Sequence, residues 1–374
     1  MTRAFARAVS TAPLLALLLG AVASSAASAG TVTTVAGDSQ KSGFANGVGT
    51  LAKFDYPYAI AVNGSGAFAY VADTSNNVIR RIAVLSATVS TVAGIAGTPG
   101  SSDGTGSSAT FSYPYGIAVD SAGSFALVSD TYNQLLRRVS LPSGAVTTIA
   151  GSLGVSGWAD GLLGRDALFN LPQGVAMNAR GSVALVADMQ NHAIRLVSVA
   201  PVGAVTTLAG RPDTPGALDG IGSAASFKKP QGVSLDSAGV RALVADTGNN
   251  LIRAIFVATG LVWTVAGSSV GGAYSDDPGA GFADGVGSNA AFCDPAGVAM
   301  SSSGTFGVVA DSCNYAVRLI VLETRMVTTI AGSWNHGSAD GVGTLASFKY
   351  PVGVALDSSG KNALVVRAAA LILR

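Results

Sequence analysis

Short runs of apolar, mostly β-branched residues alternate along the chain with clusters of Gly, Asp, Asn and Ser. One unit shows the pattern: YGIAV (115–119) is an apolar run, DSAG (120–123) is a turn, and FALVSD (125–130) is the next run. After the short loop TYNQ, LLRRV (135–139) and AVTTIAG (145–151) supply two more apolar runs. Runs of this kind bounded by turn residues are typical of strands. The unit therefore predicts four antiparallel strands.

The same unit recurs six times, and a proline marks the start of each first strand. These prolines are Pro57, Pro114, Pro172, Pro230, Pro295 and Pro351, at intervals of 56 to 58 residues with one interval of 65. Four strands repeated at such a period are typical of propellers. We predict an all-β fold, a six-bladed β-propeller of four-stranded antiparallel blades, as one domain over residues 30–374.

The two ends of the chain predict how the ring closes. TVTTVAG (31–37) has the sequence of a fourth strand, although it stands before the first complete unit. Arg374 aligns with Arg80, at the start of a third strand. We therefore expect the N-terminal strand to complete the last blade and to hold the two ends of the ring together.

One polar run could be either an active site or a structural staple. VADTGNNLIR (244–253) contains Asp246, Asn249 and Arg253, and four other units contain the same three residue types. The counterparts are Asp73, Asn76, Arg80, Asp130, Asn133, Arg137, Asp188, Asn191, Arg195, Asp311, Asn314 and Arg318. A site that is needed once would not be written five times. We interpret these residues, and the aspartates of the repeated Asp-Gly pairs, as structural, because Asp and Asn tie turns and Arg clamps carboxylates.

The sixth unit departs from this pattern. It reads VVRAAALILR, so Arg367 and Ala370 stand where the other units have Asp and Asn. Two interpretations remain open: a degenerate closing blade, or a chain that is a piece of a longer protein.

The repeated motifs resemble those of a known family. P-x-G, then V-A-D-x-x-N-x-x-I-R, then V-T-T-x-A-G, is similar to the NHL repeat of six-bladed propellers, over essentially all of residues 30–374. The resemblance implies the fold. It implies little about activity, because relatives include receptors, RNA-binding modules and lyases.

The first 29 residues have the order of a secretory signal. Arg3 and Arg7 precede an apolar stretch over about residues 13–23, and Ala27-Ser28-Ala29 follows it. A basic start, an apolar middle and small residues at the end predict a signal peptide (1–29) that is cleaved after Ala29. The apolar stretch is shorter than the roughly 20 residues that span a bilayer, so we expect a secreted protein with no membrane span in its mature chain.

Composition narrows the set of partners. The net charge is +1 and only 11% of residues are charged, so no dense basic surface is available for phosphates. We therefore expect no nucleic-acid partner, and we expect a monomer. Cys293 and Cys313 lie in two loops that emerge on the same face of one predicted blade, and no other unit has cysteine there. In an oxidising compartment this predicts a disulfide.

Binding residues are expected where the units differ, at the mouth of the central channel. The candidates are Tyr58, Tyr115, Gln173, Gln231, Tyr132 and His192. Aromatic rings with a few polar groups suit a protein, peptide or glycan ligand. The alternative is that these side chains only pack between loops.

Catalytic chemistry finds little support in the sequence. The family resemblance includes lyases with a histidine-held zinc, but His192 and His336 are the only histidines, so three histidine ligands are impossible. Glu323 is the only glutamate, and no Gly-x-Ser-x-Gly elbow is present. We assign no catalytic residue and no cofactor. A hydrolase or lyase with an unrecognised channel site remains the alternative.

The one unusually long loop contains two neighbouring carboxylates that could bind calcium. Asp276 and Asp277 lie between Ser268 and Gly281, and hard cations favour carboxylate oxygens. Two carboxylates are too few to specify such a site, so they remain weak candidates.

Overall fold

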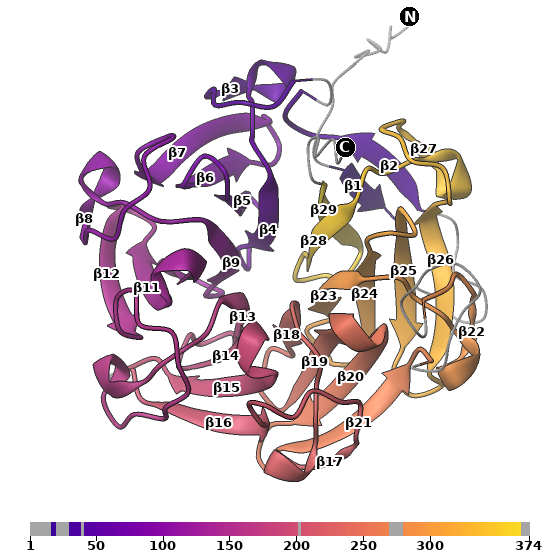
Figure 1. The fold of residues 1–374 in the computed structure, drawn as a ribbon. Coiled ribbons are helices and arrows are strands. Elements are labelled where there is room, and N and C mark those ends of the chain that lie inside the picture. The colour runs from indigo at the N-terminus through magenta and orange to yellow at the C-terminus, as the bar shows by residue number, and fades with distance from the viewer. Residues whose placement is uncertain (1–15, 20–29, 39–40, 201–202, 269–279, 368–374) are drawn as a thin grey trace, which may run out of the picture.

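The computed structural model describes residues 16–19, 30–38, 41–200, 203–268 and 280–367. It shows an all-β propeller, with sheets arranged in a ring around a centre (Figure 1). The first strand of each sheet packs beside the first strand of the next sheet. None of the described residues forms a helix with the length and apolarity that a bilayer crossing requires.

Five sheets are regular blades, numbered here in chain order, each formed from consecutive segments. Blade 1 contains β4 (Pro57–Val62), β5 (Phe68–Asp73), β6 (Val78–Ala83), β7 (Thr88–Gly94) and β3 (Gly47–Val48). Blade 2 contains β9 (Pro114–Val119), β10 (Phe125–Asp130), β11 (Leu135–Ser140), β12 (Ala145–Ala150) and β8 (Gly104–Thr105). Blade 3 contains β13 (Pro172–Met177), β14 (Val183–Asp188), β15 (Ala193–Ser198) and β16 (Val205–Gly210).

The next two blades follow the same order from the centre outward. Blade 4 contains β18 (Val233–Leu235), β19 (Arg241–Asp246), β20 (Leu251–Phe256), β21 (Leu261–Ala266) and β17 (Gly220–Ile221). Blade 5 contains β23 (Pro295–Met300), β24 (Phe306–Asp311), β25 (Ala316–Val321), β26 (Met326–Gly332) and β22 (Gly285–Val286). The expectation of four strands was incomplete for blades 1, 2, 4 and 5, because the glycine of an Asn-Gly pair in blade 1, or of an Asp-Gly pair in blades 2, 4 and 5, begins a fifth, two-residue strand at the outer edge.

Short 3-10 helices complete the units. One group lies in the loops at the outer edge of the sheets: η1 (Gly49–Leu51), η2 (Gly106–Ser108), η4 (Gly164–Asp166), η6 (Gly222–Ala224), η8 (Gly287–Asn289) and η9 (Gly343–Leu345). The other group joins second and third strands: η3 (Thr131–Asn133), η5 (Met189–Asn191) and η7 (Thr247–Asn249). The glycine-rich loops predicted from sequence therefore contain regular single turns.

The sixth sheet brings both ends of the described chain together. Its order is β27 (Gly341–Val342), β2 (Thr31–Thr34), β1 (Ala16–Leu19), β29 (Asn362–Arg367) and β28 (Pro351–Leu356). The N-terminal strand β2 therefore joins this sheet, as expected. It does not pair with β29, because β1 lies between the two and takes the place of a third strand.

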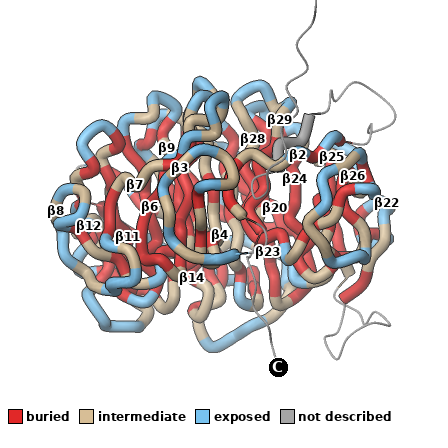
Figure 2. The backbone as a smooth tube through the Cα atoms, turned by 90° about the horizontal axis from the view of Figure 1, so that it is seen from above, coloured by how far each residue is buried: buried red, intermediate tan, exposed pale blue. Residues whose placement is uncertain are grey.

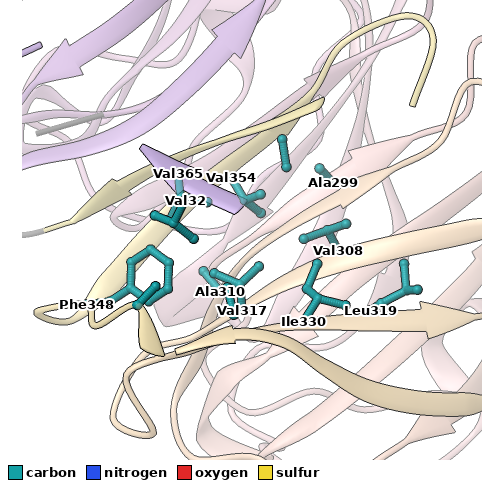
Figure 3. Packing of buried hydrophobic residues seen from close by; sticks show 13 residues of the cluster. Val32, Ala299, Val308, Ala310, Val317, Leu319, Ile330, Phe348, Val354 and Val365 are labelled. Atoms are coloured by element: carbon teal, nitrogen blue, oxygen red, sulfur yellow. The ribbon is translucent and has the colours of Figure 1, made fainter. Parts of the chain in front are cut away.

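Side chains fix β2 in the sheet. Val32 is 3% exposed and packs in one cluster with Phe348, Val354 and Val365 (Figure 3). Thr34 donates from its backbone N–H and its hydroxyl to Asp340, at 3.1 and 2.6 Å. In blade 5 the same two bonds join Thr329 to Asp284. The side of β2 that faces the outer strand is therefore held like a fourth strand.

The hydrophobic core is divided among the seams between sheets. Each of the six buried clusters combines side chains of neighbouring sheets. One of them joins Ala355 and Leu364 of the sixth sheet to Ile60 and Val71 of blade 1. Figure 2 shows the result: strands are buried through the middle of the ring, and exposed residues gather in the loops at its rims.

Glycine at the third position of P-x-G lets the sheets approach closely at the centre. A Cβ atom on Gly174 would lie 2.3 Å from the carbonyl oxygen of Gln231 in blade 4. Gly116, Gly232, Gly297 and Gly353 would meet the next sheet's backbone in the same way. Because such contacts are far inside van der Waals distance, a side chain at these positions would force the ring open.

The repeated Asp, Asn and Arg form one buried network in each regular blade. In blade 4, Asp246 accepts hydrogen bonds from Asn249 Nδ2 at 2.8 Å and Arg253 Nη1 at 2.9 Å. Arg253 Nη2 also reaches Asp219 Oδ1 at 2.8 Å, and its guanidinium stacks over Phe227. Burial raises the pKa of Asp246 to about 6, while the charge of Arg253 opposes that rise. The network ties the second strand, the third strand and the outer loop together.

Candidate functional site

The channel mouth is crossed by one hydrogen bond. Tyr58 follows Pro57 on β4, and its hydroxyl donates to Gln231 Oε1 at 2.5 Å. Blade 4 lies three blades further round the ring, so this bond joins distant parts of the sequence across the centre. Tyr115 of blade 2 lies beside Tyr58, with ring centroids 4.5 Å apart. Tyr58, Tyr115 and Gln231 line one cavity together.

Five tyrosines of blades 1 and 2 at the channel mouth form two groups of neighbouring rings, here named the aromatic wall. Tyr56 lies 6.2 Å from Tyr58, and Tyr113 stacks on the exposed Tyr132 with centroids 4.6 Å apart. Burial raises the pKa of Tyr115 to about 12, and its tyrosine neighbours add to the rise. Burial also raises the pKa of Tyr58. Both phenols therefore stay protonated near neutral pH, and that of Tyr58 donates its proton to the hydrogen bond with Gln231.

The other two candidates, Gln173 and His192, make different contacts. Gln173 is buried on β13, and its Oε1 has no hydrogen-bond partner among the described residues. His192 accepts a hydrogen bond at Nδ1 from the backbone N–H of Lys229 in the next blade, at 3.1 Å. Burial lowers the pKa of His192, and the charge of Lys229 adds to this effect. His192 therefore links two blades and favours its neutral form.

The link made by His192 has counterparts at other seams. The residue after the repeated Asn accepts from the backbone N–H that precedes the next unit's proline. The pairs are Asn77 with Tyr113 at 2.8 Å, Gln134 with Leu171 at 2.7 Å, and Asn250 with Asp294 at 2.8 Å. These accepting residues have φ between 54 and 61°, which is uncommon for residues with side chains. Because the same bond recurs at other seams, we interpret the contact of His192 as one that joins neighbouring blades.

A second aromatic group includes a histidine whose place beside two tyrosines the sequence pattern did not indicate. Tyr315, His336 and Tyr350 lie within 5.1 to 5.9 Å of one another by ring centroids. The hydroxyl groups of Tyr315 and Tyr350 are 3.4 Å apart, and this bond, with burial, raises the pKa of Tyr315 to about 12. Tyr315 and Tyr350 hold repeat positions beside the mouth, but His336 lies in a long loop whose path no local motif predicts.

The channel cavity itself is small. Its volume is about 60 Å³, and it is narrowed by the P-x-G glycines of five sheets and by Ala59 of blade 1. Small-molecule sites usually enclose about 300–1,000 Å³, whereas one water needs roughly 30 Å³. The interior therefore suits one or two waters, and a larger ligand would contact the rim of the mouth.

The predicted disulfide is present in blade 5. Cys293 and Cys313 are bonded, with Cα atoms 5.3 Å apart, and the backbone N–H of Cys313 donates to the Cys293 carbonyl oxygen. It joins the loop that enters β23 to the loop between β24 and β25, as expected. Asp294 lies close to both sulfurs. Since only a thiolate ligates metals well, the oxidised pair offers no metal site.

The calcium candidates and one sixth-unit residue lie outside the described residues. Asp276 and Asp277 belong to the segment 269–279, and Ala370 belongs to 368–374. Arg367 is described: it is 7% exposed at the end of β29, opposite Pro351. It thus occupies the place that Asp311 holds in blade 5.

Fold and mouth together define a β-propeller whose regular blades each contain the same buried polar network. No family model matches the sequence. Individual relatives do match: the chain is 29% identical over 311 residues to NHL repeat-containing protein 2 of Bos taurus, covering 76% of this chain and 41% of that protein. It is 29% identical over 272 residues to the protein SUPPRESSOR OF QUENCHING 1, chloroplastic, of Arabidopsis thaliana, covering 72% and 25%. The chain is a homologue of NHL repeat-containing proteins, and it spans less than half the length of these relatives.

Solved structures add the fold alone. A Bacteroides thetaiotaomicron protein of unknown function superposes with a TM-score of 0.64 at 16% identity, covering 94% of this chain and 90% of the other. An auxiliary nutrient binding protein from the same organism superposes with a TM-score of 0.63 at 13% identity, covering 95% and 74%. Both likenesses support a propeller.

Proposed function

We propose that this protein is a secreted, monomeric binding or scaffolding module that holds a protein, peptide or glycan at the channel mouth. The observation that carries the proposal is the aromatic wall of Tyr56, Tyr58, Tyr113, Tyr115 and Tyr132, with Gln231 facing it across the mouth. Flat rings with hydroxyl groups suit sugar rings and peptide side chains. Two structural neighbours are described as auxiliary nutrient binding proteins, which agrees with a binding role.

We further propose that the sixth sheet is the sixth blade and that β2 closes the ring. The burial of Val32 among C-terminal side chains and the Thr34–Asp340 bonds support this closure. Secretion has a structural consequence. Cleavage after Ala29 would remove β1 and leave no strand between β2 and β29.

The binding proposal is tested on purified protein with peptide and glycan arrays. Tyr115→Ala and Tyr132→Ala should each weaken a captured ligand's affinity by about tenfold, because stacked aromatic contacts are lost. Tyr350→Ala, which changes the second aromatic group, is the matched control and should keep the affinity. Equal binding by all four proteins would refute the assignment of the wall. Substrate turnover that Tyr58→Phe abolishes would instead favour the alternative of a channel hydrolase or lyase.

A further inference from the structure

A second cavity, far larger than the channel, lies at the seam between blades 4 and 5. Its volume is about 580 Å³, within the range of about 300–1,000 Å³ that is usual for ligand sites. Its walls include Phe256, Trp263 and Met300, and two charged side chains, Arg241 and Glu323, also line it. Arg241 begins the second strand of blade 4, Phe256 ends its third strand, and Val321 ends the third strand of blade 5; β21 and the end of β23 add further wall residues. The cavity therefore opens on the face opposite the channel mouth.

The repeat supplies an internal comparison for this cavity. At the first position of the second strand, Arg241 replaces Phe68, Phe125, Val183 and Phe306 of the other blades. On the third strand, two residues before the residue that pairs with this position, Ala254 replaces Arg81, Arg138, Leu196 and Leu319 of the other blades. A large side chain is thus missing from blade 4 where every other regular blade has one.

At the seam between blades 2 and 3 the equivalent space is filled. The guanidinium of Arg138 stacks 4.2 Å over the ring of Phe125. That ring also lies against the turn of blade 3, since a Cβ on Gly181 would come within 2.6 Å of it. In blade 4 both partners have changed, and the corresponding turn glycine, Gly304, lines the open cavity.

Other changes turn this space into a lined pocket. Trp263 lies directly opposite Ala254 on β21, where the other blades have Ser90, Thr147, Thr206 and Thr328. Phe256 replaces Ala83, Ser140, Ser198 and Val321. A packing defect alone would leave a small void, but here two large rings have been added around the missing side chain. The departures therefore concentrate apolar surface around one cavity.

The charged groups are also departures from the repeat. Glu323 stands where blades 1 to 4 have Leu85, Pro142, Ala200 and Ala258, each following a residue that makes the same backbone bond. Arg241 and Glu323 are both exposed, and neither side chain has an ion pair or hydrogen bond within the described part of the chain. One cation and one anion, from neighbouring blades, therefore remain available at one pocket.

We propose that this pocket binds a small zwitterion with an apolar body, such as an apolar amino acid or short peptide. The apolar body lies against Trp263, Phe256 and Met300, which excludes water from their surfaces. Arg241 pairs with the ligand's carboxylate, and Glu323 pairs with its ammonium group. This site is separate from the channel mouth and does not depend on the function proposed there.

The first test uses N-phenyl-1-naphthylamine, a neutral aromatic probe that fluoresces in apolar surroundings. We expect one binding site on the full chain, with energy transfer from Trp263 that Trp263→Phe reduces. Ala254→Leu introduces the residue of blades 3 and 5 and should weaken the probe by about tenfold or more, because the side chain fills the cavity. Leu196→Met, at the equivalent place in blade 3, is the control and should leave probe binding unchanged. If Ala254→Leu keeps full affinity, the pocket is not the site.

The second test addresses the charges, with the dipeptide Leu-Phe as the competing probe. Leu-Phe should displace the naphthylamine more strongly than its acetylated and amidated form, which has no charge. Arg241→Gln and Glu323→Gln should each weaken Leu-Phe by about tenfold, the loss of one charged contact, while naphthylamine affinity stays within about twofold. Equal competition by the charged and blocked dipeptides, or unchanged competition in both variants, would overturn the assignment of the head group.

Discussion

Blade 4 and the sixth sheet have side chains of opposite charge at the last position of the second strand. In blade 4 the second strand ends in Asp246, which is held by Arg253 of the third strand. In the sixth sheet the second strand, β29, ends in Arg367. Burial lowers the pKa of this guanidinium, and the charge of Asp340 opposes that effect. Its Nη2 has no hydrogen-bond partner among the described residues.

The comparison distinguishes two contributions to stability: apolar packing between sheets and buried ion pairs within a sheet. Both sheets bury apolar side chains at their seams, and in both a threonine hydroxyl donates to the aspartate of an Asp-Gly pair, Thr34 to Asp340 and Thr264 to Asp219. Among the residues that the structure describes, an ion pair between second and third strands is found in the five regular blades and not in the sixth sheet. The sixth sheet thus keeps the architecture through its seams, while the regular blades also depend on paired buried charges.

The largest expected effect tests whether β2 belongs to the sixth sheet's core. Val32→Asp puts an unpaired carboxylate among apolar side chains and should cost on the order of 4 kcal/mol or abolish cooperative unfolding. Thr33→Asp changes the exposed neighbour on the same strand and should cost little. Urea unfolding followed by circular dichroism measures both. Equal stability of the two variants would show that β2 does not close the ring.

The second prediction compares the two arginines directly. Arg253→Ala leaves Asp246 buried and unpaired, and should lower the free energy of unfolding by roughly 3–5 kcal/mol. Arg367→Met replaces a guanidinium that lacks a complete set of partners, and should change it by less than about 1 kcal/mol. Chemical denaturation of both variants checks the contrast. A larger loss for Arg367→Met than for Arg253→Ala would remove the distinction between the sheets.

The smallest prediction concerns the link between blades 3 and 4. The pKa of His192 is lower in the folded state than its ordinary 6.5, so the unfolded chain takes up a proton first as the pH falls. Its contribution to stability is therefore present above pH 6.5 and is lost as the pH falls through the folded pKa. His192→Gln introduces the residue type of Gln134, which makes the same link without titrating. Unfolding measured from pH 7.5 to 5 should show a smaller decline for the variant; identical slopes would contradict the link.

The sequence by itself determined the parts of this protein that depend on local patterns. Alternating strands, turns and a fixed period predicted the propeller and the five Asp, Asn and Arg sets. Two cysteines in neighbouring loops of one blade predicted the disulfide that the structure contains. Each of these features lies within one unit, or is repeated, so its geometry follows from short-range chain connectivity.

Only the tertiary structure decided which distant residues meet. Tyr58 and Gln231 are separated by 173 positions, and no local pattern indicates that they bond across the channel. β1 entered the sixth sheet although its residues read as the apolar middle of a signal peptide, because strand pairing requires only a free edge of matching length. The pocket between blades 4 and 5 likewise depends on residues of different blades. The small side chain of Ala254 leaves space in blade 4, Glu323 of blade 5 supplies a charge, and only the packing of the two blades brings them to one cavity.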